Sequence, residues 1–239
     1  MTELIYQTDS YVRTFTAKIT AVDVANSSVL LDQTAFYPGG GGQPADIGQL
    51  KVDGKLYAMP RARKGPEGIW HSLTGGEPLP QVGAEVEGQI DWERRYQLMR
   101  THTAMHILCG VVFRDYGAQV TGGDMEPLKG RMDFEFETLS KELVGVIEAA
   151  VNHEVNQAHA VRVDILPREK AFQIPDLIRT KINLLPPDIQ VIRIIELVGL
   201  DLQADGGTHV HNTSEVGRMR VVDYKSKGKI NKRIYVELD

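Results

Sequence analysis

A long stretch without glycine or proline begins just after Asp91 and separates two halves of the chain with different patterns. Asp91 is suited to the N-cap of a helix, and Glu93 lies in the first turn, where a carboxylate interacts favourably with the helix dipole. The first helix breaker downstream is Gly110. The sequence therefore predicts a helix from about residue 92 to 115, with a domain boundary at about residue 90.

The half before this boundary, residues 1–90, is rich in β-branched residues and is interrupted repeatedly by glycine and proline. Asp53-Gly54 is typical of a two-residue hairpin turn. Many short strands separated by turns favour a small β-barrel-like domain. Strands are predicted at 11–22, 28–32 and 50–56.

The half from 91 to 239 mixes helical and strand patterns. Ser140 is suited to the N-cap of a second long helix, which we expect to end at about His159. Strands that look antiparallel surround the helices, so this half is predicted to be an α+β domain with long helices. Its strands are predicted at 131–137, 161–166, 190–197, 218–223 and 233–238.

The composition excludes several classes of function and structure. A net charge of −5 excludes a general basic field for nucleic acid, so any RNA contact must use local basic patches. Cys109 is the one cysteine, which excludes an intrachain disulfide. No apolar run approaches the roughly 20 residues that span a bilayer, and the start has no basic segment followed by an apolar one. We expect a cytoplasmic protein without a membrane segment.

Two pairs of residues predict a metal site. His102 and His106 are four residues apart in the expected helix, so both imidazoles project from one face about 6 Å apart. Asp205 and His209 flank a glycine-rich turn, which lets the chain fold back so that both reach one ion. Three or four nitrogen and oxygen ligands suit Zn²⁺, and with only three a position stays open for water or substrate.

Two other residues compete as ligands. His211 is close in sequence to His209, but in a strand it would point to the opposite side. Cys109 lies near the helix face of His106, although packing in the core is the simpler interpretation of a cysteine among apolar neighbours.

A second cluster surrounds four consecutive glycines at 39–42. Without side chains, their backbone N–H groups can approach a ligand closely. A flexible hairpin tip is the alternative, but it would not need the hydrogen-bonding neighbours Thr34, Tyr37 and Gln43. The candidate substrate contacts are Gly40, Gly41, Gly42 and Thr34.

Three segments in this order resemble the alanyl-tRNA editing proteins of the AlaX family, medium-length class. Residues 31–48 resemble the glycine-rich motif, 100–106 the HxxxH motif and 206–210 the GGTHV motif of the second metal segment. The same elements occur in the editing domain of alanyl-tRNA synthetase and the related second additional domain of threonyl-tRNA synthetase. The resemblance implies a barrel-like domain at 1–90 and a metal-binding editing domain at 91–239.

One position departs from the family pattern. The family usually has cysteine where this chain has Asp205. A carboxylate binds zinc at about 2.0–2.2 Å, whereas a thiolate binds at about 2.3 Å. The substitution puts the identity and occupancy of the ion in question more than the location of the site. The resemblance implies one Zn²⁺ per chain, bound by His102, His106, Asp205 and His209.

The resemblance also implies the reaction, which is hydrolysis of mischarged seryl-tRNA(Ala), with glycyl-tRNA(Ala) as a second candidate substrate. An alanine pocket cannot strongly exclude glycine or serine, so a separate hydrolytic site must correct the error. Thr34 is the candidate contact for the serine hydroxyl, and Gln43 for orienting the ester or water. We expect metal-assisted ester hydrolysis, with the terminal ribose hydroxyl helping proton transfer.

The expected partner is tRNA(Ala) mischarged with serine, and each phosphate contact would add salt dependence to binding. The oligomeric state stays open, with a monomer slightly favoured. Basic residues near the C-terminus are the candidate tRNA contacts: Lys225, Lys227, Lys229, Lys232 and Arg233.

Two other functions compete with editing. One is a metal-dependent hydrolase of other small esters or amides, which would be indifferent to tRNA identity. The other is a non-catalytic tRNA-binding module with a structural zinc site, which would need four protein ligands closed around the ion.

Overall fold

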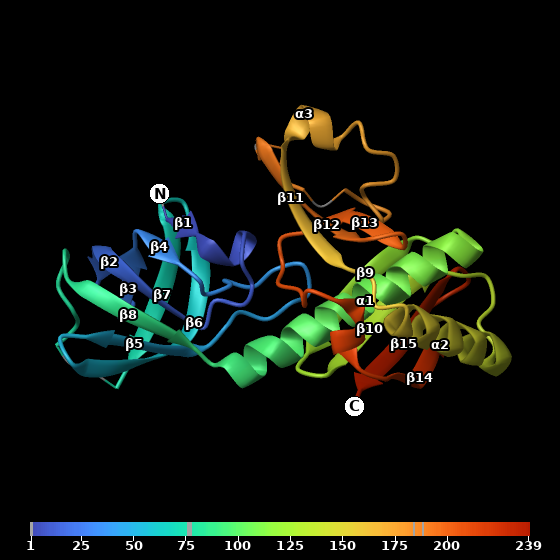
Figure 1. Cartoon of the computed structure of the whole chain (residues 1–239), viewed down its shortest axis with the longest axis horizontal. Coiled ribbons are helices and arrows are strands. Elements are labelled where there is room, and N and C mark those ends of the chain that lie inside the picture. Colours follow the sequence, from blue (N-terminus) through green and yellow to red (C-terminus); the bar gives the residue numbers. More distant parts are fainter. Residues whose placement is uncertain (1, 76–77, 184, 188) are drawn as a thin grey trace. The chain divides into compact units, whose positions relative to one another are not determined.

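The chain divides into two compact units, Met1–Tyr96 and Gln97–Asp239, in a computed structural model. Each unit has its own core and is described by itself; the domains expected from the sequence were 1–90 and 91–239 (Figure 1). The structure describes residues 2–75, 78–183, 185–187 and 189–239.

The first unit is a closed barrel with the strand order β2-β3-β7-β6-β5-β8. Alternate residues of each strand point inward; on β2, for example, Phe15, Ala17 and Ile19 are buried in the barrel core. Outside the barrel sheet, β1 (Glu3–Leu4) pairs with β4 (Gln33–Thr34), and a 3-10 turn covers Ile5–Gln7. The barrel strands are β2 (Thr14–Asp23), β3 (Ser28–Leu31), β5 (Gly48–Val52), β6 (Lys55–Gly65), β7 (Gly68–Thr74) and β8 (Glu85–Ile90).

The predicted barrel is confirmed, and so is the hairpin at Asp53-Gly54. These two residues connect β5 and β6 with φ angles of 49° and 79°, the positive values that a tight two-residue hairpin turn requires. β7 and β8 were not predicted. β8 contains glycine and two glutamates, which have low β propensity, and it is held by pairing with β2 and β5 on either side.

Helix α1 (Trp92–Tyr116) begins as expected, with Asp91 Oδ1 accepting a hydrogen bond of 3.2 Å from the Arg94 N–H. In the second unit it packs against a four-stranded antiparallel sheet ordered β14-β15-β10-β9. Gly130 permits this close packing, because a Cβ there would lie 2.7 Å from Met105 Sδ of α1. The strands are β9 (Val120–Glu126), β10 (Lys129–Glu135), β14 (Met219–Ser226) and β15 (Asn231–Leu238).

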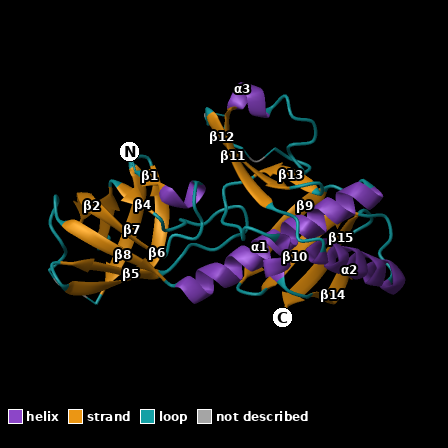
Figure 2. Cartoon of the chain, in the orientation of Figure 1, coloured by secondary structure: helices purple, strands orange, loops and turns teal. Residues whose placement is uncertain are grey.

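Helix α2 (Lys141–Asn156) lies along the edge strand β14 (Figure 2). The Asn152 amide donates to the Met219 carbonyl at 2.8 Å, and Asn152 Oδ1 accepts from the Met219 N–H at 2.9 Å. Ser140 caps the helix as predicted. The expected end at His159 was too late, because Ala158 adopts a positive φ of 54° and turns the chain.

A three-stranded sheet, β11-β12-β13, completes the second unit together with α3 (Arg168–Ala171) and a 3-10 turn at Thr213–Val216. Its strands are β11 (Val161–Pro167), β12 (Val191–Leu197) and β13 (Asp201–Ala204). The α+β class expected for this half is confirmed. Within the described part of the chain, no helix is long and apolar enough to cross a membrane.

Candidate metal centre and glycine-rich motif

Four side chains of the second unit converge on one point: His102, His106, Asp205 and His209. One ligand atom from each lies within 4.8 Å of the others. The two imidazoles of α1 are four residues apart, with ring centroids separated by 5.1 Å, and the His209 ring stacks on His102 at 4.2 Å. The three histidines are buried, and the Asp205 carboxylate is 14% exposed.

The loop that carries Asp205 and His209 is held by a network of hydrogen bonds. Asp205 Oδ2 accepts from the Gly207 N–H at 2.7 Å and lies 3.0 Å from His209 Nε2. Arg193, a buried residue of β12, donates to the carbonyl oxygens of Asp205 at 3.1 Å and Gly207 at 2.8 Å. The carboxylate is therefore held facing the imidazoles.

Two of the histidines also have a polar side chain beside the Nδ1 atom of the ring. Thr103 Oγ1 lies 3.1 Å from His209 Nδ1 and accepts from the Val210 N–H at 3.3 Å. His106 Nδ1 lies 3.4 Å from Asp201 Oδ2. In both rings the Nε2 atom is left to face the cluster.

The roles of Thr103, Asp201 and Arg193 were not predicted from the sequence. Arg193 could have been noticed because it is a charged residue inside the apolar run of β12.

The competing ligands lie outside the cluster. The expectation that His211 belongs to a strand was wrong, since it lies in a loop before the 3-10 turn, and it is exposed. Cys109 is buried, and burial raises the pKa of its thiol. Both observations leave the donor set as three nitrogens and one carboxylate.

The electrostatic environment keeps these donors able to bind a cation. Burial lowers the pKa of His102 to about 4 and that of His209 well below its usual value of 6.5. Burial would raise the pKa of Asp205, but the neighbouring charges of His102 and His209 and the hydrogen bond from His209 lower it well below 3.8. At neutral pH the two rings are therefore uncharged and Asp205 is ionised.

His106 differs from the other two histidines. Burial alone would lower its pKa, but the neighbouring carboxylates of Asp201 and Asp205 raise it above 6.5. A buried cluster of three imidazoles and one ionised carboxylate is the ligand chemistry that Zn²⁺ accepts, so these residues fit such an ion.

The glycine-rich motif belongs to the first unit and forms a fixed turn. Gly40, Gly41 and Gly42 have φ angles of 135°, 58° and 88°, a conformation that side chains disfavour. The backbones of Gly40 and Gln43 exchange hydrogen bonds of 3.0 and 2.9 Å. Tyr37 Oη donates to the Gly40 carbonyl at 2.9 Å. These contacts hold the turn in one conformation, which does not fit the alternative of a flexible hairpin tip.

The base of this turn is held by a buried ion pair. Arg95 is fully buried and pairs with Asp46, and it also donates to the carbonyls of Ser10 at 2.9 Å and Ala35 at 2.6 Å. Asp46 in turn accepts from the Tyr37 N–H at 2.6 Å. This pair was not predicted from the sequence.

Thr34 lies on β4 and has no exposed surface. Its hydroxyl is 2.8 Å from His71 Nε2 and accepts from the Phe36 N–H at 3.1 Å. Gln43 is also buried. Thr34, Gln43 and the glycines thus form one group in the first unit, and the four candidate metal ligands form another in the second.

The His71–Thr34 contact gives a testable pH dependence. Burial lowers the pKa of His71 to about 4, so the unfolded chain takes up a proton near pH 6.5 before the folded one does. Stability is full above pH 6.5 and is lost as pH falls towards 4, by about 3 kcal/mol from this group.

We expect His71→Gln to flatten that part of the urea-unfolding pH profile, whereas replacement of the exposed His153 by Gln leaves it unchanged. An identical slope in His71→Gln and in the unmodified chain would contradict the assignment.

The basic residues near the C-terminus differ in their surroundings. Lys225, Lys227 and Lys229 are exposed at the hairpin between β14 and β15. Lys232 is buried, and its ammonium donates to the carbonyls of Gly228 and Lys229 at 2.7 and 2.9 Å. Arg233 pairs with Asp133 through two hydrogen bonds of 2.6 and 2.7 Å.

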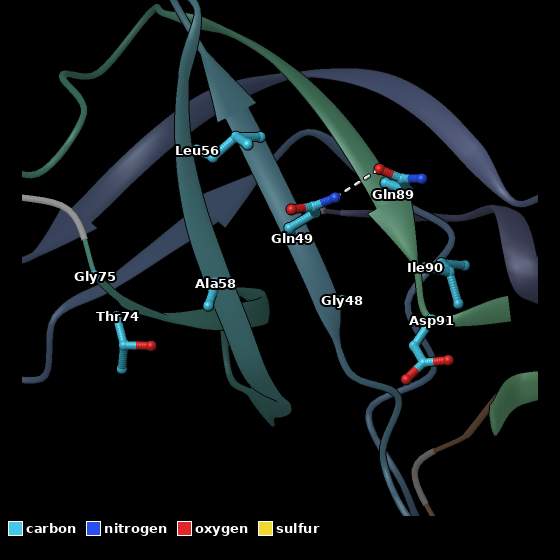
Figure 3. Close-up of a pocket in the computed structure, with 9 residues that line it drawn as sticks. All are labelled: Gly48, Gln49, Leu56, Ala58, Thr74, Gly75, Gln89, Ile90 and Asp91. Atoms are coloured by element: carbon cyan, nitrogen blue, oxygen red, sulfur yellow. Dashed lines mark hydrogen bonds between the residues drawn. The ribbon is translucent and has the colours of Figure 1, made fainter. Parts of the chain in front are cut away.

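A groove of about 550 Å³ lies on the barrel wall between residues of β5, β6 and β8 (Figure 3). Gln49 Nε2 donates to Gln89 Oε1 across it at 2.7 Å. Its walls are mainly small and amide residues, with the carboxylate of Asp91 at one end. No histidine is among the described residues that line the groove, so it offers less for catalysis than the cluster in the second unit.

Comparison with known proteins agrees with the motifs. Residues 6–94 match the family described as tRNA synthetases class II (A), and residues 192–235 match the threonyl and alanyl tRNA synthetase second additional domain. The chain is 39% identical over 237 residues to the alanyl-tRNA editing protein AlaX-M of Saccharolobus solfataricus, covering 98% of each chain. The chain belongs to the AlaX-M family.

Other relatives support this membership, and one of them is a longer protein of which this chain matches only a part. AlaX-M of Methanosarcina mazei is 35% identical over 245 residues, covering 100% of this chain and 97% of that one. An alanine–tRNA ligase of Sulfurisphaera tokodaii is 35% identical over 229 residues, which is 93% of this chain but 24% of the ligase. The family resemblance inferred from the three motifs is confirmed.

Proposed function

We propose that this chain is an aminoacyl-tRNA deacylase that hydrolyses the ester of seryl-tRNA(Ala), with glycyl-tRNA(Ala) as a second substrate, in a zinc-assisted reaction. The observation that carries the proposal is the buried cluster of His102, His106, Asp205 and His209. It occurs in a chain that is similar over its full length to proteins named for alanyl-tRNA editing.

The four residues would hold one Zn²⁺ per chain. His102 and His209 are uncharged at neutral pH, so they do not repel a cation, and ionised Asp205 supplies negative charge. With one position left open to the substrate, bound zinc would supply Lewis-acid polarisation of the ester carbonyl. Arg193 keeps the Asp205 loop in place, and Thr103 keeps the His209 ring in one orientation.

Discrimination between serine and alanine would come from Thr34. A hydroxyl takes part in three hydrogen bonds, one as donor and two as acceptor. His71 and the Phe36 N–H use two of these, which leaves one for the serine hydroxyl. Alanine would leave that bond unmade, and this loss is the basis of selectivity up to about 10⁴–10⁵. Gln43 would orient the ester beside Gly40, Gly41 and Gly42, where no side chain obstructs the backbone.

Contact with the tRNA would fall to the exposed lysines of the β14–β15 hairpin. Lys225, Lys227 and Lys229 are the phosphate contacts that we propose. Lys232 and Arg233 would support them, because both stabilise the hairpin through contacts within the protein.

The test is deacylation of seryl-, glycyl- and alanyl-tRNA(Ala) by zinc-loaded protein, by chelated protein and by protein to which zinc has been restored. We expect rapid loss of serine, slower loss of glycine and retention of alanine, with activity lost on chelation and regained with zinc. A folded, zinc-loaded sample that hydrolyses no aminoacyl-tRNA would contradict the proposal.

Two controls separate the competing functions. Equal activity on free seryl esters would favour a hydrolase that is indifferent to tRNA. Binding of tRNA(Ala) without hydrolysis would favour a non-catalytic module with a structural zinc ion.

A further inference from the structure

We propose that Asp201 is the residue that positions His106 for metal binding, by accepting the Nδ1–H of its ring and directing Nε2 towards the ion. The proposal rests on the metal centre of the proposed function. Asp201 is the first residue of β13, and its Oδ2 lies 3.4 Å from the buried His106 Nδ1. Among the described residues, no other hydrogen-bond partner reaches that nitrogen.

The Asp201 carboxylate is held by groups that fix both of its oxygens. Its side chain is fully buried. Arg179 Nε donates to Oδ1 at 3.2 Å, and Gln203 Nε2 donates to Oδ2 at 2.6 Å. Burying a carboxylate costs several kcal/mol unless it is paired and hydrogen-bonded, and here Arg179 supplies the compensating charge.

Arg179 is itself fixed in place. Its guanidinium lies 3.9 Å above the Phe113 ring of α1, the helix that also carries His106. Its backbone carbonyl accepts from the Val120 N–H at 3.1 Å. The chain of contacts from Phe113 through Arg179 and Asp201 to His106 therefore begins and ends on one rigid helix.

This arrangement determines which ring nitrogen of His106 carries the proton. Nδ1 faces a carboxylate, which only accepts, so the neutral ring keeps its proton on Nδ1 and its lone pair on Nε2. Histidines that bind metals commonly donate their other N–H to a carboxylate, which raises the basicity of the ligating nitrogen. His209 has a hydroxyl, Thr103, in the corresponding place. The Nδ1 atom of His106 thus has a charged neighbour, whereas the Nδ1 atom of His209 has an uncharged hydroxyl.

The competing interpretation is that Asp201 serves the fold alone, as the counter-ion of Arg179. Under that interpretation, its loss would lower the melting temperature but would leave the protonation of His106 and the zinc affinity of the folded protein unchanged. The two interpretations are separable by measurements on the ring itself.

The experiment compares Asp201→Ala and Asp201→Asn with Asp164→Ala, a control at an exposed carboxylate of β11. Zinc affinity is measured by competition with a chromogenic chelator. The tautomer of His106 is measured in metal-free protein by long-range ¹H–¹⁵N NMR at about pH 9, where imidazoles are neutral.

We expect Asp201→Ala to weaken zinc binding roughly 10- to 100-fold and to give a mixture of His106 tautomers. Asp201→Asn keeps an acceptor oxygen and should lose less zinc affinity than Asp201→Ala. It also provides the test if the alanine variant fails to fold. Affinities equal to that of Asp164→Ala, or an Nε2–H tautomer in the unmodified protein, would overturn the proposal. If the unmodified protein binds no zinc, the metal centre fails, while the tautomer measurement still decides the role of Asp201.

Discussion

Replacing His102 with alanine will abolish zinc binding and deacylation of seryl-tRNA(Ala) while the protein remains folded. His102 contributes one of three imidazoles, and its ring stacks on His209 and lies 3.5 Å from the Asp205 carboxylate. Loss of this ring removes a ligand from the centre of the cluster. Alanine has the highest helix propensity, so α1 persists.

The measurements are zinc content after dialysis, deacylation rate and circular dichroism. A matched control is His153→Ala, which makes the same substitution at an exposed position of α2 and should leave all three unchanged. Full zinc content and normal activity in His102→Ala would show that the cluster is not the catalytic centre.

Replacing Arg95 with leucine will destabilise the protein by about 3–5 kcal/mol, the usual cost of removing one partner from a buried ion pair. The substitution leaves the Asp46 carboxylate buried without its counter-ion and removes the donors to the Ser10 and Ala35 carbonyls. Because Asp46 also anchors the Tyr37 backbone, the glycine-rich turn should lose its fixed shape. Urea unfolding and hydrogen exchange at Tyr37 measure the two effects.

Two controls isolate the charge effect. Arg94→Leu removes one hydrogen bond to the Ala45 carbonyl and should cost about 1 kcal/mol. Adding Asp46→Asn to Arg95→Leu removes the unpaired charge and should restore part of the stability. If Arg95→Leu and Arg94→Leu were equally stable, the buried pair would not be what holds the turn.

Features that depend on neighbours in sequence were predictable. The start of α1 follows from the Asp91 cap, and the Asp53-Gly54 hairpin from its need for positive φ. The ligand pair His102 and His106 follows from helix geometry, because residues four apart share a face. Three motifs in order were enough to predict the family.

Features that depend on distant parts of the chain were not predictable from the sequence. β8 has weak strand propensity and exists because β2 and β5 pair with it. Helix α2 ends earlier than its pattern suggested, at a turn where the Asn212 side-chain amide donates to the Ala158 carbonyl at 2.7 Å. Arg95 reads as an ordinary charged residue of a helix start, and only the fold brings Asp46 to it.

The sequence by itself determined the local elements and the chemical types of the four candidate ligands, because both follow from spacing and from backbone preference. Only the tertiary structure decided which groups surround those ligands. Asp201 reaches His106 across 95 positions of the chain, and Thr103 reaches His209 across 106. No periodic pattern encodes such pairs, since they arise where separate elements pack and buried polar groups must find partners.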